Sequence, residues 1–148
     1  MKKVISVIIS IALILSFSSF AYADECGKNN TRASNYLSSY SISLTPTTNH
    51  QLVISVDVEA KRQMTSIGVF EMYIEEYNET LGAWDEYDVW YGTSNPSIYY
   101  EYNSWDYVGT FYFTGTPGKD YRVTFTCFAM DSTGGDTGSV ISVTRTCV

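Results

Sequence analysis

The sequence predicts an all-β protein that folds as a single antiparallel β-sandwich of about seven strands. Three observations lead to this class. Apolar and polar residues alternate along several short segments, turn residues separate these segments, and no segment combines helical periodicity with caps. The 125 residues after residue 23 have the length of one domain, and a sandwich is the commoner outcome for such strands at this size.

Residues 50–60 form the clearest expected strand, because its apolar residues alternate strictly and are placed on one buried face: Leu52, Ile54, Val56 and Val58. Residues 67–77 form a further strand in which Phe70, Met72 and Ile74 are expected to share a face. The other strands are expected at residues 36–44, 84–91, 107–114, 121–130 and 139–147. In the final hairpin, a turn centred near Gly134 and Gly135 would place Cys127 opposite Ser142.

The first 23 residues are typical of a secretory signal peptide. A basic start at Lys2 and Lys3 precedes the apolar run of residues 4–15, and an Ala-x-Ala cleavage site ends at Ala23. An uncleaved membrane anchor is the alternative, although the apolar run is short for a membrane span. We therefore expect a secreted, extracellular protein that is not bound to a membrane after cleavage, with a flexible arm at residues 24–35 and the β-sandwich at residues 36–148.

The charge of the chain is strongly acidic. All sixteen acidic residues lie after residue 23 with seven of the nine Lys and Arg, so this part carries a net charge of −9. Nine acids and no basic residue lie between Arg62 and Lys119. This balance disfavours nucleic acid and anionic lipid as partners. It indicates either a solvated surface or a surface that attracts a basic partner.

Three cysteines follow the signal peptide, and an odd count outside the cytoplasm suggests one bridge and one free thiol. Cys127 alternates with core-facing residues and is out of register with Cys147 in the terminal hairpin. We therefore expect a Cys26–Cys147 disulfide, with three free thiols as the alternative.

The chain shows no catalytic motif, and we expect a protein that is not an enzyme. His50 is the only histidine and stands beside a strand, without the oriented base that a Ser or Cys nucleophile needs. Glu71, Glu75, Asp85 and Glu86 could in principle supply paired carboxylates for glycoside hydrolysis, but such a reaction also needs a deep cleft. No cofactor is expected.

No metal site is expected either. The cysteines and His50 lack the close ligand pairs of structural zinc. The loop from Asp131 to Gly138 has two acids among glycines, which is compatible with a calcium site or with a hairpin loop that needs glycine for its backbone, and the hairpin loop is favoured.

The candidate binding residues are aromatic. Eleven Tyr, Trp and Phe residues lie between Tyr87 and Phe113, and those beside loop signals are expected to be partly exposed. The candidates are Tyr99, Tyr100, Tyr102, Trp105 and Tyr107. Exposed Tyr and Trp rings suit stacking on sugar rings or anchoring a partner protein. Alternatively, these rings form cross-strand pairs that only stabilise the sheet.

The terminal hairpin resembles the last two strands of a fibronectin type III domain, over residues 117–129 and 139–146. This resemblance implies an immunoglobulin-like sandwich in which Tyr121 forms a corner, with its hydroxyl bonded back to the backbone. The early tryptophan of that family is absent from residues 52–58.

A longer resemblance is to a family of small exported proteins of Gram-positive bacteria that is classed only as a domain of unknown function. It rests on the following residues in this order: Arg32-Ala33-Ser34, Tyr36-Leu37, Met64, Ile67-Gly68-Val69, Ile74, Glu76-Tyr77-Asn78, Trp84, Tyr102-Asn103, Gly115, Gly118 and Tyr121. It implies an exported bacterial all-β protein and no particular activity.

The sequence thus favours a secreted, non-catalytic binding or adhesion module whose exposed aromatic residues contact an extracellular glycan or protein. The alternative is a structural or accessory extracellular protein that self-associates through sheet edges and binds no small ligand.

Overall fold

The computed structural model describes residues 27–29 and 34–148. The predicted signal peptide and Cys26 lie outside the described residues. The elements in chain order are β1 (Gly27–Asn29), β2 (Leu37–Pro46), β3 (Gln51–Asn78), β4 (Ala83–Tyr91), the 3₁₀ turn η1 (Gly92–Ser94), α2 (Pro96–Tyr99), β5 (Tyr100–Thr114), β6 (Asp120–Asp131), β7 (Gly134–Ile141) and β8 (Arg145–Thr146). The all-β class is confirmed. Within these residues, no helix is long and apolar enough to cross a membrane.

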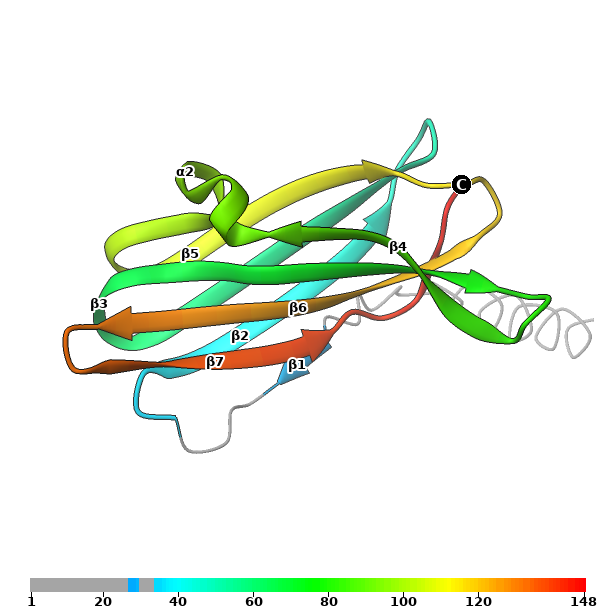
Figure 1. The fold of residues 1–148 in the computed structure, drawn as a ribbon. Helices are drawn as coiled ribbons and strands as arrows, with labels where there is room; N and C mark the ends of the chain where they lie inside the picture. The colour runs from blue at the N-terminus through cyan, green and yellow to red at the C-terminus, as the bar shows by residue number, and fades with distance from the viewer. Residues whose placement is uncertain (1–26, 30–33) are drawn as a thin grey trace, which may run out of the picture.

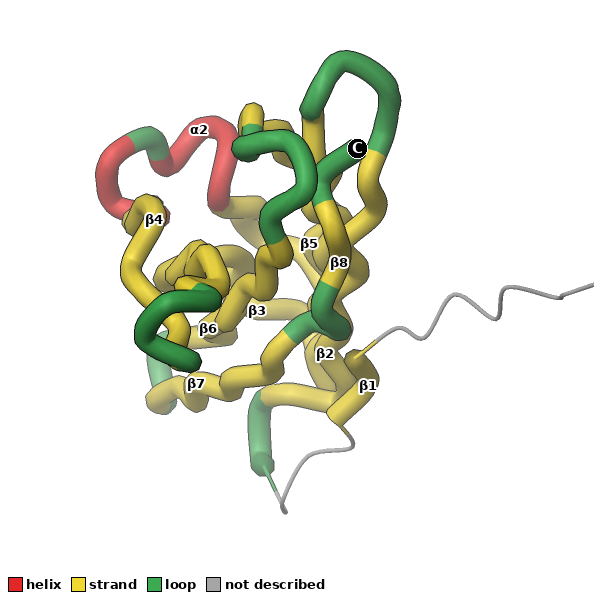
Figure 2. The backbone as a smooth tube through the Cα atoms, turned by 90° about the vertical axis from the view of Figure 1, so that its right-hand side faces the viewer, coloured by secondary structure: helices red, strands yellow, loops and turns green. Residues whose placement is uncertain are grey.

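The described strands form one antiparallel sheet of eight strands that curls on itself (Figure 1). Neighbouring strands follow the order β1-β2-β3-β6-β7. In addition, β4 and β5 each pair with β3, and β8 pairs with β6. The expected division into two separate sheets is not confirmed. The strand β3 pairs with strands in both parts of the curled sheet and so joins them into one. Seen along the strands in Figure 2, the sheet surrounds one core, and α2 lies at the side where β4 leads into β5.

The strand β3 is the central strand of the sheet. Its first part pairs with β2 and β5, and its second part pairs with β4, β5 and β6. The sequence predicts two separate strands here, but residues 60–66 continue the strand through a bend instead of breaking it. The β3–β5 register shifts between Glu59 and Met64, and Asn103 of β5 adopts a positive φ of 53° beside this shift. Strands that bend together in this way carry a sheet around a corner.

The core confirms the period-two pattern of the first part of β3. Leu52, Ile54, Val56 and Val58 are at most 2% exposed. They face apolar residues of β2, β5 and β6, which also lie in the core: Leu37, Ile42, Leu44, Phe111, Phe113, Tyr121, Val123, Phe125 and Cys127. Burial of this continuous apolar set is the main force that closes the curled sheet.

Tyr121 lies at the start of β6 and is fully buried. Its hydroxyl accepts a hydrogen bond from the backbone N–H of Thr116 at 2.8 Å and donates one to the carboxylate of Glu76. The backbone bond has the form that the fibronectin-like corner implies. Membership of that family stays a prediction.

The structure adds a short strand near the N-terminus and corrects one local prediction, the position of the terminal turn. Residues 27–29, inside the predicted flexible arm, form β1 and pair with Tyr40–Ile42 of β2. The terminal hairpin turns at residues 132–133 and not at Gly134–Gly135, so Cys127 lies opposite Gly138 and not Ser142. The turn moves because the Asp131 carboxylate accepts the backbone N–H of Thr133 at 2.7 Å, which closes a tight turn ahead of the glycines.

Candidate aromatic binding pocket

A pocket of about 600 Å³ opens on the outer face of the sheet, where β3, β5, β6 and β7 meet near the terminal hairpin turn. We call it the aromatic pocket, because rings supply most of its large side chains. It is lined by Ser66, Phe70, Tyr100, Tyr102, Phe128, Ala129, Met130, Gly135, Asp136 and Thr137. No Lys or Arg belongs to this lining.

The register of the sheet explains why the pocket forms here. Ser66 of the central strand β3 lies between Tyr102 of β5 and Met130 of β6. The next outward-facing position, Gly68, lies between Tyr100 and Phe128 in the same way. Small residues on the middle strand and large ones on both neighbours leave a hollow over β3.

Both the backbone conformation and the lack of room for a side chain require glycine at position 68. Its φ is 153°, and a Cβ there would lie 2.1 Å from the carbonyl oxygen of Tyr99. Without a side chain at this position, the start of β5 comes close to β3. The rings of Tyr100 and Phe128 then meet edge to face over Gly68, with centroids 4.8 Å apart. This contact closes one end of the hollow.

Phe70 faces the pocket because of a β-bulge. The β3–β6 register moves from Val69 opposite Cys127 to Glu71 opposite Thr126, so β3 carries one extra residue. Phe70 is that residue and is 49% exposed, whereas Met72 and Ile74 are fully buried. The prediction that Phe70 shares their face is therefore wrong, because the bulge reverses the alternation between Val69 and Met72.

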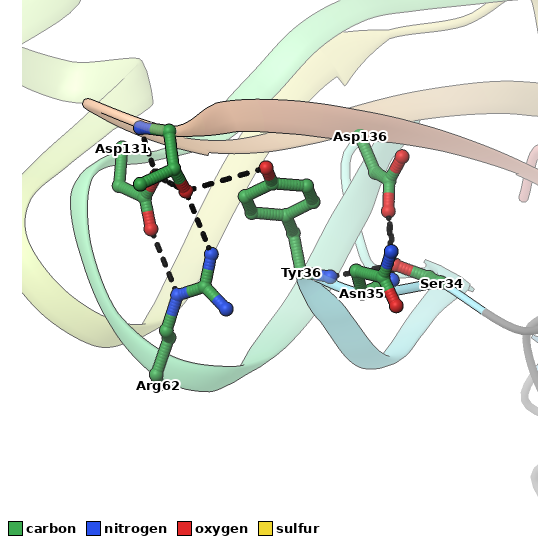
Figure 3. A network of polar contacts seen from close by, with 7 residues as sticks. Ser34, Asn35, Tyr36, Arg62, Asp131 and Asp136 are labelled. Atoms are coloured by element: carbon green, nitrogen blue, oxygen red, sulfur yellow. Dashed lines mark hydrogen bonds and ion pairs between the residues drawn. The ribbon is translucent and has the colours of Figure 1, made fainter.

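The rim of the pocket is polar on the β7 side. Asp136 accepts, through Oδ2, a hydrogen bond from the hydroxyl of Ser34 and another from the backbone N–H of Asn35 at 3.2 Å (Figure 3). These bonds hold the segment before β2 against β7. On the β5 side, burial and then the nearby Tyr102 raise the pKa of Tyr100, so its hydroxyl keeps its proton.

Beside the pocket, Arg62 lies against the terminal hairpin turn (Figure 3). Its Nε is 2.8 Å from Oδ2 of Asp131, and its guanidinium lies 4.7 Å from the ring centroid of Tyr36. Hydrogen bonds from Thr133 and Arg62 lower the pKa of Asp131 to about 2. The Asp131 carboxylate is thus occupied by protein donors, which favours the hairpin-loop interpretation of residues 131–138 over calcium. Across residues 27–29 and 34–148, no group of three or more His, Cys, Asp and Glu side chains is placed to hold a metal ion.

The five aromatic residues predicted to bind do not gather in one place. Tyr100 and Tyr102 line the aromatic pocket. Tyr99 stacks on the ring of Phe111 at a centroid distance of 5.1 Å. Tyr107 is buried, donates to the carbonyl of Ile98 at 2.9 Å, and has a pKa raised mainly by burial. Trp105 is 56% exposed but does not line the pocket.

Sequence reasoning missed three apolar lining residues: Phe70, Phe128 and Met130. For two of them a signal was available, because the outward face of β6 changes from Thr124 and Thr126 to Phe128 and Met130. Large apolar residues on the solvent side of a strand are an indication of a binding surface. Phe70 could not be found by alternation, since its orientation depends on the bulge.

The groups considered for catalysis and cross-linking lie elsewhere. His50 is exposed, and its Nδ1 is 3.2 Å from the carbonyl of Val148. Cys127 and Cys147 are buried free thiols, and burial raises the pKa of Cys127 to about 12. Because Cys26 is outside the described residues, the Cys26–Cys147 bridge stays a prediction.

Comparisons with protein-family models, with curated proteins and with solved structures find no match to this chain. The two resemblances noted in the sequence therefore stay predictions.

Proposed function

We propose that the protein is a secreted, non-catalytic binding module that holds a carbohydrate in the aromatic pocket. The observation that carries the proposal is the group of exposed rings around a hollow of about 600 Å³. This volume lies within the range of roughly 300–1,000 Å³ that small-molecule sites occupy. Secretion rests on the predicted signal peptide.

The ring geometry supports stacking of a ligand on the pocket wall. Tyr102 is 57% exposed, and its ring is turned 75° from that of Tyr100. The two rings meet at an angle and are not stacked in parallel, and more than half of the Tyr102 side chain stays open to a ligand. An exposed Tyr face is flat and apolar and suits the C–H face of a sugar ring.

The polar groups of the lining fit the hydroxyls of such a ligand. Ser66 and Thr137 contribute hydroxyls, Asp136 a carboxylate, and Tyr100 a protonated phenol. This set contains donors as well as acceptors, as the hydroxyls of a sugar require. A strongly anionic ligand would find no Lys or Arg in this lining.

A glycan array followed by titration calorimetry tests this function. We expect the chain to bind at least one neutral glycan, and Tyr102→Ala to weaken that binding by about tenfold or more through the lost stacking contact. Tyr91→Ala is the matched control, because Tyr91 is a tyrosine of β4 that is 51% exposed and lies outside the pocket.

Trp105→Ala separates the pocket from the wider aromatic region predicted from the sequence. It should leave glycan binding unchanged, because Trp105 does not line the pocket. Binding that survives Tyr102→Ala but not Trp105→Ala would move the site away from the pocket. Failure to bind any glycan would leave a protein partner as the ligand class and reject the carbohydrate proposal.

A further inference from the structure

Among the described residues, the strand β5 is paired along one edge only, and the other edge is contacted at its end by Tyr87 of β4. Within the described part of the chain it pairs only with β3, in an uninterrupted register from Gln51 opposite Thr114 to Glu59 opposite Asp106. In Figure 1 the other edge is the upper side of the yellow strand. We call residues 107–114 of this strand the β5 edge.

The β5 edge lacks the features that normally prevent edge-to-edge pairing. Residues 107–114 read Tyr-Val-Gly-Thr-Phe-Tyr-Phe-Thr and contain no charged residue and no proline. Lys, Pro and bulges are the usual protection of an exposed edge. Val108 and Tyr112 are 69% and 56% exposed on its outer face. The edge is therefore rich in residues that favour strand pairing.

The unpaired edge of β4 is protected by charge, whereas that of β7 carries Asp136, which is bonded to Ser34 and Asn35. β4 pairs only with β3, and its residues include Asp85, Glu86 and Asp88, all exposed. Two β4 strands placed side by side in antiparallel orientation would bring these acids together, and like charges opposite each other destabilise a sheet. Self-pairing is consequently disfavoured at β4 and allowed at β5.

The direction of the backbone groups identifies which residues of β5 face outward. The N–H of Gly115 bonds to the carbonyl of His50 at 2.8 Å and so points toward β3. The carbonyl of the preceding Thr114 accepts the hydroxyl of Tyr87 at 2.6 Å and points away from β3. Because these directions alternate along an antiparallel strand, the N–H and C=O groups of Val108, Thr110 and Tyr112 also point away from β3.

We propose that two copies of the chain associate through antiparallel pairing of their β5 edges, with Thr110 on the two-fold axis. This inference goes beyond the proposed carbohydrate site, which lies at the other end of β5 and does not depend on it. In this register Thr110 faces Thr110 of the partner subunit. Val108 faces Tyr112 of the partner subunit, and the pairing ends there, because the carbonyl of Thr114 already accepts the hydroxyl of Tyr87.

Each of these pairs is compatible with a stable sheet. Thr with Thr and a β-branched residue with an aromatic one are favourable cross-strand pairs. The nearest acid of this strand, Asp106, lies outside the paired residues. A two-fold axis makes the contact self-complementary and closed, so it produces a dimer and not a filament. A contact of one strand with one strand is small, so the dimer is expected to dissociate in the micromolar range.

Sedimentation equilibrium over a concentration series tests the proposal. The unaltered chain should show a monomer–dimer equilibrium. Thr110→Lys and Thr110→Glu should each weaken the dimer by about tenfold or more, because each places two like charges on the axis. An equimolar mixture of the two variants should restore the dimer, since Lys then faces Glu. Thr45→Lys is the control, because Thr45 is an exposed threonine of β2, two strands from the β5 edge.

Hydrogen exchange on the unaltered chain gives a second measurement that needs no substitution. The amides of Val108, Thr110 and Tyr112 should become more protected as the protein concentration rises. A chain that stays monomeric at every concentration, or variants that dimerise as well as the unaltered chain, would overturn the proposal. Failure of the Lys–Glu mixture to associate would overturn the position of the axis. Because none of these readouts uses a glycan, their failure leaves the carbohydrate proposal untouched.

Discussion

The hydroxyl of Tyr121 accepts the backbone N–H of Thr116 at 2.8 Å, and this bond fixes the loop between β5 and β6 to the core. Tyr121 is fully buried, and its ring packs edge to face against Tyr87 and Phe113. Burial and the bond to Glu76 raise the pKa of Tyr121 to about 12, so the phenol stays protonated over the physiological range.

Tyr121→Phe keeps the ring and removes this hydroxyl. We expect a loss of about 1–3 kcal/mol in the free energy of unfolding, because the Thr116 N–H and the Glu76 carboxylate both lose a partner in a partly buried site. Urea denaturation measures the effect. Tyr112→Phe is the control and should change the free energy of unfolding very little, because Tyr112 is exposed. Equal stability of the two variants would mean that the corner bond contributes nothing.

Gly68→Ala tests the close approach of β5 to β3. The added Cβ would lie 2.1 Å from the Tyr99 carbonyl oxygen in a backbone with φ of 153°. Gly118→Ala isolates the steric part of the cost, because Gly118 also has a positive φ, of 80°, but no atom within 4 Å of the added Cβ. We expect Gly68→Ala to be more destabilising by at least about 1 kcal/mol in urea denaturation. A smaller loss than at Gly118 would show that β5 moves away from β3 without cost.

Because Thr133 and Arg62 stabilise the ionised carboxylate of Asp131, the stability of the fold should depend on pH in the acid range. The pKa of Asp131 falls from its ordinary 3.8 to about 2 in the folded chain. The contribution of the Asp131 carboxylate to the free energy of unfolding is therefore present above about pH 4 and is lost as the pH falls from there toward 2. Melting temperatures between pH 5 and pH 2 should fall less steeply in Asp131→Asn than in the unaltered chain.

Arg62→Gln provides the companion measurement for this acid dependence. It removes one donor to Asp131 and leaves Thr133 in place, so part of the pH dependence should remain. A melting profile of Asp131→Asn that parallels the unaltered chain throughout would contradict the lowered pKa.

The two described cysteines should resist thiol reagents while the chain is folded. Cys127 is fully buried with a pKa near 12, and Cys147 is 1% exposed. Iodoacetamide should label them only after denaturation, as mass spectrometry of the peptides would show. Peptide mapping of the exported protein without reductant tests the Cys26–Cys147 prediction, and a bridge that contains Cys127 would refute it.

Local alternation was sufficient to predict the elements that lie wholly within one part of the sheet. The burial of Leu52 to Val58 follows from period-two patterning, and the backbone bond of Tyr121 was implied by the resemblance of the terminal hairpin to fibronectin type III. Both depend on neighbours in the sequence. The pairing of Tyr100 and Tyr102 in one pocket also follows from their spacing of two residues.

The remaining features depend on contacts between distant segments. Lys61, Arg62 and Gln63 appear as a polar break in the sequence, yet Arg62 bonds to Asp131 and Gln63 donates to the Asn103 carbonyl at 2.7 Å, so the bend is held from other strands. The bulge at Phe70 is defined only by its partner β6. Such features cannot be obtained from the alternation of a single strand.

The continuity of β3 has a consequence for how the molecule can move. A strand of 28 residues that passes through both parts of the sheet offers no linker about which one part could swing relative to the other. Because the floor of the aromatic pocket belongs to this same strand, the backbone beneath a ligand is already in place before the ligand arrives. An occupant would thus lose its own freedom on entry without having to order this strand.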